Sequence, residues 1–334
     1  MQDLTSLNTL ALASRANTFL AYRDAGQLPL VSQLIDRYGQ PFILGGGSNV
    51  VLMPRLQRPV VHVVSRGIQV LEQTATHRLV QVAAGENWHD WVAWCVAQGW
   101  GGLENLALIP GTVGAAPVQN IGAYGLELET RIQSLQVWDI RAGKEITFRP
   151  EDCAFAYRDS LFKQAPAGRW MILSVTFRLP TRWEPLLDYP DLQQDSTLAE
   201  RGSAMTPADV FDAVCRIRRA KLPDPATLPN AGSFFKNPVV DDAQYQTLKQ
   251  RWPQLRAFGT GDGRWKLAAG WLIEQAGWKG KRMGAVGMHE RQALVLVNHG
   301  LATAHDVQAL ARQVQSDVLA QFGVMLEQEP VTVC

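Results

Sequence analysis

The sequence predicts an α+β fold, in which short strands mix irregularly with helices, followed by a separate C-terminal domain of α/β type. The predicted strands are short and do not alternate regularly with helices, as a doubly wound sheet would require. A stretch rich in proline and acidic residues, residues 180–207, interrupts the pattern and predicts a linker or mobile loop. Beyond it, a strand, a long helix and a final strand (residues 294–326) predict a crossover unit.

Length, composition and charge exclude several classes of protein. The 334 residues suffice for two or three domains, and 46% hydrophobic with 19% charged residues is typical of a globular core. A formal net charge of +1 gives no field that would attract nucleic acid or an acidic membrane. No stretch reaches the ~20 apolar residues of a membrane-spanning helix, and the N-terminus lacks a secretory signal. The four cysteines are widely spaced, which predicts free thiols and a cytosolic protein.

The first 180 residues carry the periodicities of both helices and strands. Apolar residues at helical spacing predict helices over residues 28–38 and 88–98, each followed by a glycine. Ala142 and Gly143 predict a hairpin turn between two strands. The predicted strands cover residues 41–44, 60–64, 68–71, 79–83, 132–138, 146–148 and 171–179.

The last 130 residues are predicted to be more helical. Thr206 and Pro207 begin a helix that ends in a basic cluster, where cations also suit the helix dipole. Thr303 begins a helix that ends at Gly323. Further helices are predicted over residues 242–251 and 267–275, and strands over residues 294–297 and 324–326.

A glycine-rich motif follows the strand predicted at residues 41–44. Backbone N–H groups can converge on an anion only where no Cβ blocks them, so three glycines followed by Ser-Asn suit a phosphate cradle. The alternative is a glycine-rich hairpin turn, since the motif is neither a Walker loop nor a Gly-x-Gly-x-x-Gly fingerprint. Its residues are Gly45, Gly46, Gly47, Ser48 and Asn49.

Residues 109–125 form the most unusual stretch of the chain. They include four glycines, two prolines and three alanines, with one aromatic residue and no formal charge. Such a composition suits neither a helix nor a central strand, and it is too apolar for a solvated loop. It predicts a backbone that passes close to a large flat ligand, with Gln119 and Asn120 offering amide groups; the alternative is a buried turn between core strands.

Two polar clusters remain as candidates for chemistry. The first is Tyr157-Arg158-Asp159-Ser160, which as a bare sequence could equally be a surface turn with an Arg–Asp pair. The second surrounds Ser233, whose hydroxyl could face a ligand or simply cap a turn. Metal and serine-hydrolase sites are not expected, because the six histidines are scattered and no Gly-x-Ser-x-Gly elbow is present.

These motifs together resemble the MurB family, the UDP-N-acetylenolpyruvoylglucosamine reductases of bacterial cell-wall synthesis, in the type I form. They occur in the order that the family shows and cover nearly the whole chain. The segments that carry the resemblance are residues 45–49, 109–125, 157–163, 221–225, 230–238, 266–273 and 326–329.

The resemblance implies a fold, a cofactor and a reaction. The fold is a two-lobed FAD-binding domain of the PCMH/vanillyl-alcohol-oxidase type plus a C-terminal α/β substrate-binding domain. Residues 1–66 would form the first FAD-binding lobe, residues 67–200 the second lobe with a loop at Tyr189, and residues 201–334 the substrate domain. The implied activity is that of a UDP-N-acetylmuramate dehydrogenase: NADPH reduces non-covalent FAD, which then reduces the enolpyruvyl group of a UDP-sugar during peptidoglycan synthesis.

The resemblance also implies roles for individual residues. Ser233 would donate a proton, while Arg158 and Glu329 would hold and polarise the substrate carboxylate; Glu327, one strand period away, is the alternative to Glu329. The implied partner is the UDP-sugar, bound by a cytoplasmic monomer that engages no nucleic acid or membrane. The implied substrate contacts are Tyr157, Tyr189, Lys221, Asn237 and Gln292. The implied FAD contacts are Gly45, Gly46, Gly47, Ser48, Asn49, Ile109, Pro110, Gly111, Gly114, Ala115, Gln119, Asn120, Ile121, Gly122, Tyr124, Gly125 and Arg218.

Two other functions remain open at this level. A flavin oxidase or dehydrogenase of the same fold, acting on a small hydroxylated substrate, would explain the glycine motifs but not Ser233, Lys221 and Asn237 together. A non-catalytic protein that binds nucleotide sugars would explain the scaffold, but not the presence of Arg158, Ser233 and Glu329.

Overall fold

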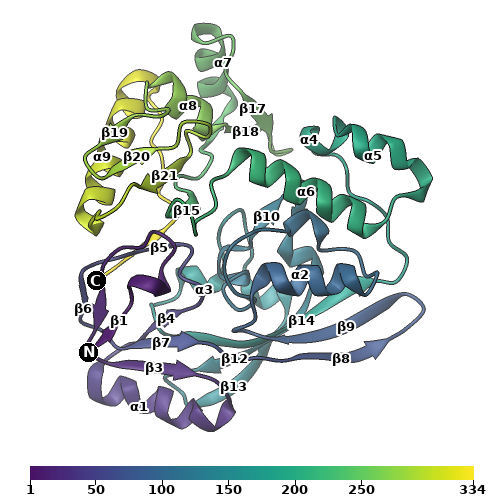
Figure 1. The fold of residues 1–334 in the computed structure, drawn as a ribbon, viewed down its shortest axis with the longest axis vertical. Helices are drawn as coiled ribbons and strands as arrows, with labels where there is room; N and C mark the ends of the chain where they lie inside the picture. Colours follow the sequence, from purple (N-terminus) through teal and green to yellow (C-terminus); the bar gives the residue numbers. More distant parts are fainter. The chain divides into compact units, whose positions relative to one another are not determined.

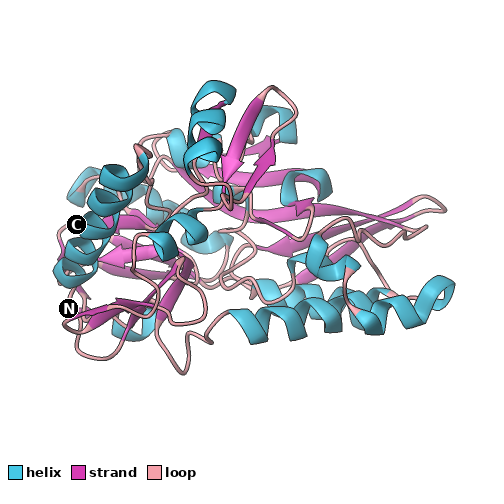
Figure 2. Ribbon diagram, turned by 90° about the horizontal axis from the view of Figure 1, so that it is seen from above, coloured by secondary structure: helices cyan, strands magenta, loops and turns pink.

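The computed structural model describes residues 1–334, which pack as two compact units (Figure 1). The structure contains both helices and strands, with a largely antiparallel pairing of the strands, which agrees with the predicted α+β class (Figure 2). Unit 1 comprises Met1–Gln2, Ala16–Gly47 and Gln57–Ala220, and unit 2 comprises Asp3–Arg15, Ser48–Leu56 and Lys221–Cys334. These packing units differ from the predicted domains, which are divided at residues 66 and 200 by the ligand that each would bind; that division stays a prediction.

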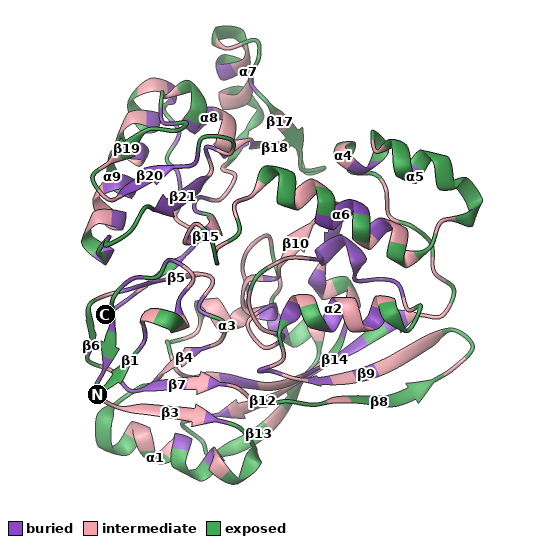
Figure 3. Cartoon of the chain, in the orientation of Figure 1, coloured by how far each residue is buried: buried purple, intermediate pink, exposed green.

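A five-stranded antiparallel sheet forms the centre of unit 1, in the order β13-β12-β14-β9-β8. Helix α2 (Trp88–Ala97) covers one face, where Trp88 and Trp91 contact Phe177 with ring centroids 6.0 and 5.4 Å apart (Figure 1). Side chains are buried along β14, whereas the edge strand β8 is largely exposed (Figure 3). The strands are β8 (Ile68–Gln73), β9 (His77–Ala83), β12 (Ile132–Asp139), β13 (Lys144–Phe148) and β14 (Trp170–Pro180).

A smaller parallel sheet in unit 1 has the order β3-β7-β4. Helix α1 (Leu28–Tyr38) connects β3 to β4, buries Leu28 and Val31, and ends at Gly39 with φ +80°. Ser32 on this helix donates a hydrogen bond to the Ile140 carbonyl at 3.1 Å, which ties α1 to the end of the large sheet. The strands are β3 (Phe19–Tyr22), β4 (Phe42–Leu44) and β7 (Val60–Val63).

The predicted linker at residues 180–207 is wrong in one respect, because the segment contains two short helices that pack on unit 1. Helix α4 (Pro190–Gln193) buries Leu192, and helix α5 (Ser196–Arg201) buries Leu198. A single apolar residue anchors each helix, which leaves too little periodicity for a prediction. Helix α6 (Pro207–Lys221) begins as predicted: the Asp209 N–H donates to Thr206 Oγ1 at 3.3 Å, and the Thr206 N–H donates to Asp209 Oδ2.

Unit 2 is built on a four-stranded antiparallel sheet in the order β15-β21-β20-β19. Helices α8 (Ala269–Gln275) and α9 (Ala304–Phe322) pack together, with the rings of Trp271 and Phe322 5.9 Å apart. A three-stranded sheet with the order β16-β18-β17 accompanies helix α7 (Asp242–Arg251). The strands are β15 (Asn230–Ser233), β16 (Val239–Asp241), β17 (Ala257–Gly259), β18 (Arg264–Leu267), β19 (Arg282–Met283), β20 (Val286–Met288) and β21 (Val295–Asn298).

The crossover unit predicted over residues 294–326 is not present. Val324 and Leu326 are buried and Met325 is exposed, so the segment has the alternation of a strand but no partner strand. The last strand is instead β22 (Val331–Val333), which pairs in parallel with β5 (Val50–Leu52). The helix predicted from residue 267 begins at Ala269, because the preceding residues belong to β18.

Short elements complete the chain. All four cysteines are free thiols, as predicted, and Cys95, Cys153 and Cys215 are buried. None of the helices has the length and apolar character needed to cross a membrane. The remaining strands and α-helix are β1 (Gln2–Asp3), β2 (Arg15–Ala16), β6 (Arg55–Leu56), β10 (Gly122–Ala123), β11 (Leu126–Glu127) and α3 (Leu161–Gln164). The 3-10 helices are η1 (Thr5–Leu7), η2 (Ala25–Gln27), η3 (Glu104–Leu106), η4 (Pro117–Gln119), η5 (Leu128–Arg131), η6 (Pro150–Cys153) and η7 (Gly202–Ala204).

Candidate active site

The glycines of the two glycine-rich motifs meet inside unit 1, to which residues 45–47 and 109–125 belong. A Cβ on Gly45 would lie 2.7 Å from Thr112 Oγ1, and a Cβ on Gly46 would lie 2.8 Å from the Gly111 Cα. Folded proteins do not tolerate contacts this short against backbone, so only glycine fits at residue 46. The loop after β4 and the stretch at residues 109–125, here called the glycine wall, therefore form one continuous backbone surface.

The glycine wall is fixed to the junction between β9 and α2. The Gly114 N–H donates to the Ala84 carbonyl at 2.8 Å, and the Trp88 N–H donates to the Gly111 carbonyl at 3.1 Å. A Cβ on Gly114 would lie 2.4 Å from the Ala84 Cβ, which explains the small residue there. One side of the wall thus packs on the core of unit 1, as the buried-turn alternative requires, while Pro110 and Gly125 are exposed.

Asn120 connects the glycine wall to neighbouring backbone through its side chain. It is fully buried with φ +42°, its Nδ2 donates to the Ala156 carbonyl at 3.3 Å, and its Oδ1 accepts from the Glu129 N–H at 3.1 Å. The expected ligand contact through this amide does not fit such burial, so the structure gives Asn120 a positioning role.

The cluster that contains Arg158 is attached to the glycine wall. Arg158 Nη2 donates to the Gly122 carbonyl at 2.7 Å, and its guanidinium lies over the Tyr157 ring, 5.1 Å from the centroid. Ser160 is buried and donates to the Val118 carbonyl at 2.6 Å. Arg158 itself has φ +55°, an uncommon conformation for a side-chain-bearing residue. These ties to the wall favour a functional cluster over a free surface turn.

A partly buried cation lies beside the wall. Arg218 of α6 interacts with Tyr124, donates to the Leu108 carbonyl through Nη2 at 3.4 Å, and has a buried Nε without a hydrogen-bond partner. Burial lowers the pKa of Arg218 and raises the pKa of Tyr124 to about 12. An unsatisfied guanidinium nitrogen in such a place suits an anionic or carbonyl-rich ligand.

The segment that carries Tyr189 is docked on the wall. The Tyr189 ring meets the Tyr124 ring edge-on, with centroids 5.1 Å apart. Trp183 Nε1 donates to the buried Glu104 Oε1 at 2.6 Å, and Asn105 Nδ2 donates to the carbonyls of Leu186 and Tyr124 at 2.9 and 2.8 Å. Glu104, Asn105 and Trp183 were not predicted as site residues, although a Glu-Asn pair between two leucines is a signal that could have indicated them.

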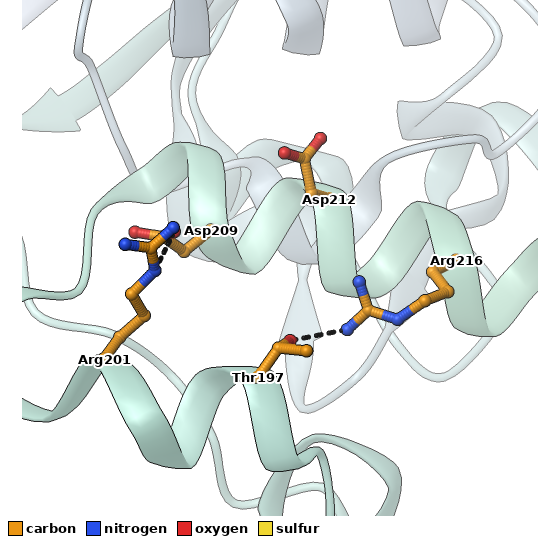
Figure 4. Close-up of a pocket in the computed structure, with 5 residues that line it drawn as sticks. All are labelled: Thr197, Arg201, Asp209, Asp212 and Arg216. Carbon is orange, nitrogen blue, oxygen red and sulfur yellow. Dashed lines mark hydrogen bonds and ion pairs between the residues drawn. The ribbon is translucent and has the colours of Figure 1, made fainter.

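A pocket of about 150 Å³ lies between α5 and α6, after the Tyr189 segment (Figure 4). Both arginines of the pocket already have partners: Arg201 lies 2.8 Å from Asp209, and Arg216 donates to Thr197 Oγ1 and to Asp195 Oδ2, each at 2.7 Å. The pocket therefore anchors α5 on α6. It is lined by Thr197, Arg201, Asp209, Asp212 and Arg216.

Ser233 is exposed at the end of β15 in unit 2. The preceding Gly232 has φ +68°, and its N–H donates to Asn230 Oδ1 at 2.9 Å. Asn230, not Ser233, therefore closes this turn, and the interpretation of Ser233 as a turn cap fails. The strand is held behind the serine by the Phe234 N–H, which donates to the Leu294 carbonyl at 2.8 Å.

Glu329 pairs with the Ser233 strand. Its N–H donates to the Phe234 carbonyl at 2.9 Å, and its carbonyl accepts from Asn49 Nδ2 at 3.3 Å. The structure thus brings Ser233, Glu329 and Asn49 together within unit 2. Glu327 instead forms an ion pair with Lys236 and is largely exposed, which favours Glu329 as the reactive glutamate.

The substrate residues predicted in unit 2 fall into two places. Asn237 Oδ1 accepts from the Ala269 N–H at 2.9 Å, and Gln292 Oε1 would lie 3.1 Å from a Cβ on Gly270, so both surround the first turn of α8. Asn237 therefore caps that helix as well. Lys221 is exposed at the end of α6.

The loop at residues 45–49, the glycine wall and the partly buried Arg218 define a flavoprotein of the two-lobed FAD-binding class, and comparison with known proteins agrees. Residues 17–149 match the family model described as "FAD binding domain". Residues 224–333 match the model described as "UDP-N-acetylenolpyruvoylglucosamine reductase, C-terminal domain". The chain belongs to the UDP-N-acetylenolpyruvoylglucosamine reductase family.

Similarity to individual proteins supports this family over the full chain. A UDP-N-acetylenolpyruvoylglucosamine reductase of Bordetella pertussis is 56% identical over 332 residues, which cover 99% of this chain and 94% of the relative. One from Burkholderia orbicola is 50% identical over 332 residues, covering 98% and 95%. The crystal structure of UDP-N-acetylenolpyruvylglucosamine reductase (MurB) from Thermus caldophilus has the same fold, with TM-score 0.68, 22% identity and full coverage of both chains. The predicted family, fold class and use of FAD with NADPH are thereby confirmed.

Proposed function

We propose that this chain catalyses the NADPH-dependent reduction of UDP-N-acetyl-3-O-(1-carboxyvinyl)glucosamine to UDP-N-acetylmuramate, a step of peptidoglycan synthesis that serves cell shape and division. The observation that carries the proposal in the structure is the contact of Gly45 and Gly46 with residues 111 and 112. It builds a surface of exposed backbone with small side chains, as a dinucleotide cofactor needs.

FAD fits this surface without a covalent link. The loop at residues 45–49 would hold the diphosphate through backbone N–H groups, and the glycine wall would lie against the flavin. The unpartnered Nε of Arg218 would meet the flavin side of the cofactor, which supports its assignment as a FAD contact. Ile109, Pro110, Gly111, Gly114, Ala115, Gln119, Ile121, Gly122 and Gly125 all keep some exposed surface, as ligand contacts must.

The chemistry assigns distinct tasks to three side chains. FAD, once reduced by NADPH, would supply the hydride that is added to the terminal methylene carbon of the enolpyruvyl group. Negative charge then develops beside the substrate carboxylate, and Arg158 and Glu329 hold and polarise that carboxylate. The Ser233 hydroxyl gives its proton to the carbon next to the carboxylate, which completes the addition of H⁻ and H⁺ across the double bond. A hydroxyl is a weak acid, but a carbanion-like carbon is a strong base.

The remaining predicted residues would bind the UDP-sugar. Lys221 is a point charge suited to the diphosphate, and Tyr157, Asn237 and Gln292 offer hydrogen-bonding groups. Tyr189 would cover the substrate from a segment whose anchors lie in the same unit as the glycine wall. We further propose a monomer in the cytoplasm that engages neither nucleic acid nor membrane. The formal net charge of +1 argues against those two partners, and the four free thiols suit a reducing compartment.

A stepwise spectroscopic experiment tests the proposal. The purified protein should be yellow, should bleach when NADPH is added without oxygen, and should regain its colour when the enolpyruvyl UDP-sugar follows. Bleaching without recovery by that substrate would point to a flavin oxidase or dehydrogenase with a different substrate. A colourless protein that cannot be reconstituted with FAD would exclude both flavin enzymes.

A further inference from the structure

Leu108, the residue directly before the glycine wall, has an unfavourable backbone conformation. Its φ is +56°, in the left-handed region where L-residues with a branched side chain are uncommon. The next residues, Ile109 to Gly111, lead to the contact with Gly46. The direction in which the chain enters the wall therefore depends on what holds Leu108 in place.

Two helices hold the backbone of Leu108 through one side chain each. The Leu108 N–H donates to Nδ1 of His89 on α2 at 3.1 Å, and the Leu108 carbonyl accepts from Arg218 on α6 at 3.4 Å. The His89 ring stacks on Phe211 of α6, with the ring planes 3° apart and the centroids at 5.4 Å. Stacking on Phe211 fixes the orientation of the His89 ring, and this orientation keeps Nδ1 directed at the Leu108 N–H.

The contact defines the protonation state of the imidazole. Nδ1 can accept from a backbone N–H only when it carries no proton, so His89 is neutral with its proton on Nε2. The charged groups that face it are Asp90 on its own helix and Arg218 and Arg219 on α6. Burial lowers the pKa of His89 below its ordinary value of 6.5; Asp90 opposes this effect, and the two arginines add to it.

We propose that His89 is a positioning residue for the flavin: its neutral imidazole holds Leu108 in the left-handed conformation that aims the glycine wall, and its protonation releases that contact. This inference rests on the proposed function, because it takes the wall to be the FAD surface. His89 touches neither cofactor nor substrate in it. It acts through Leu108.

The proposal predicts a pH dependence of a definite sign. The pKa of His89 in the folded protein is lowered. Its hydrogen bond to Leu108 is therefore fully present above pH 6.5 and is lost as the pH falls through the folded-state pKa. Protonation turns Nδ1 into a donor that faces another donor, the Leu108 N–H. FAD should therefore bind more weakly at low pH, and the wild-type protein should show a step in its dissociation constant below pH 6.5.

Two substitutions separate the acceptor from the stacking ring. Asparagine at this position places Oδ1 near the site of Nδ1 and does not titrate, so His89→Asn should bind FAD within a few-fold of wild type and lack the step. His89→Phe keeps a ring for Phe211 but has no acceptor, so above pH 6.5 it should bind FAD at least about tenfold more weakly than wild type, and it should lack the step at lower pH. Fluorescence titration of the FAD-free proteins, prepared by removing the cofactor, measures these constants without turnover.

A rescue variant guards against simple misfolding. Glycine occupies the left-handed region at no steric cost, so His89→Phe combined with Leu108→Gly should recover most of the lost FAD affinity. Equal affinity of His89→Phe and wild type across the pH range would overturn the proposal, as would a step retained by His89→Asn or failure of the double variant to recover. A wild-type protein that binds no FAD would instead refute the proposed function.

Discussion

Gly46 lies so close to Gly111 that a Cβ on Gly46 would stand 2.8 Å from the Gly111 Cα. The two residues come from motifs that are far apart in the sequence, and both keep their backbone free of side chains at the contact. Neither motif is specific alone, because glycine-rich turns are common. Their contact is what makes them one surface.

Gly46→Ala should weaken FAD binding strongly while the protein stays folded. The added methyl forces the loop and the wall apart, and overpacking of this kind costs about 1–3 kcal/mol, which is roughly 5- to 150-fold in the dissociation constant. Gly259→Ala is the matched control, because nothing lies within 4 Å of a Cβ at that position. Flavin titration with both variants measures the difference; equal affinities would show that the loop does not meet the cofactor.

Local patterns predicted the elements well because they depend on neighbours in the sequence. Helix α1 and helix α9, with its Thr303 cap, begin and end where apolar spacing and glycine placed them. Long-range pairing was not predictable in this way. The segment at Val324 and Leu326 alternates like a strand, but only the pairing of β22 with β5 decides which C-terminal segment joins a sheet.

In the candidate site too, the sequence indicated residues by their type but not the features that depend on the folded backbone. Residue types indicated Ser233 and Arg158, and the family resemblance added Glu329. Sequence could not reveal Leu108, because a positive φ at leucine leaves no mark in composition. It also misjudged Asn120, whose amide suits a ligand by type but is fully buried by contacts with residues 129 and 156.

Ser233→Ala should separate the two half-reactions. Reduction of the bound flavin by NADPH does not need the serine proton, so its rate should stay nearly unchanged. Reoxidation by the UDP-sugar should slow by about 10²- to 10⁴-fold, the usual contribution of a positioned general acid. Anaerobic stopped-flow absorbance measures both steps, and an equal fall in both rates would contradict the proton-donor role.

Glu329→Gln and Glu327→Gln form a matched pair on neighbouring positions of one segment. Glu329 is held beside the Ser233 strand by Phe234 and Asn49, so loss of its charge should slow reoxidation by at least about tenfold. Glu327 is 68% exposed and pairs with Lys236; solvent screening of the exposed carboxylate limits such a pair to about 1 kcal/mol, so its variant should react like wild type. The same stopped-flow assay measures both reoxidation rates. A slower reoxidation of Glu327→Gln than of Glu329→Gln would assign the carboxylate-polarising role to Glu327.

Trp183→Phe should impair substrate binding without affecting the flavin. The change removes the indole N–H that donates to the buried Glu104 at 2.6 Å, and an unsatisfied buried acceptor costs about 1–3 kcal/mol. Because Trp183 begins the segment that ends in Tyr189, we expect KM for the UDP-sugar to rise roughly tenfold, while FAD affinity and the NADPH half-reaction stay the same. Trp94→Phe on α2 is the control, since that indole makes ring contacts with Trp91 and Trp100 at 5.5 and 5.3 Å.

The control separates anchoring of the Tyr189 segment from general loss of stability. If both tryptophan variants lowered the thermal midpoint but only Trp183→Phe raised KM, the indole of Trp183 would be acting through the segment. Asn105→Ala should raise KM in the same way, because Asn105 Nδ2 donates to the Leu186 carbonyl at 2.9 Å and to the Tyr124 carbonyl at 2.8 Å. An unchanged KM in both Trp183→Phe and Asn105→Ala would mean that Tyr189 reaches the substrate without these anchors.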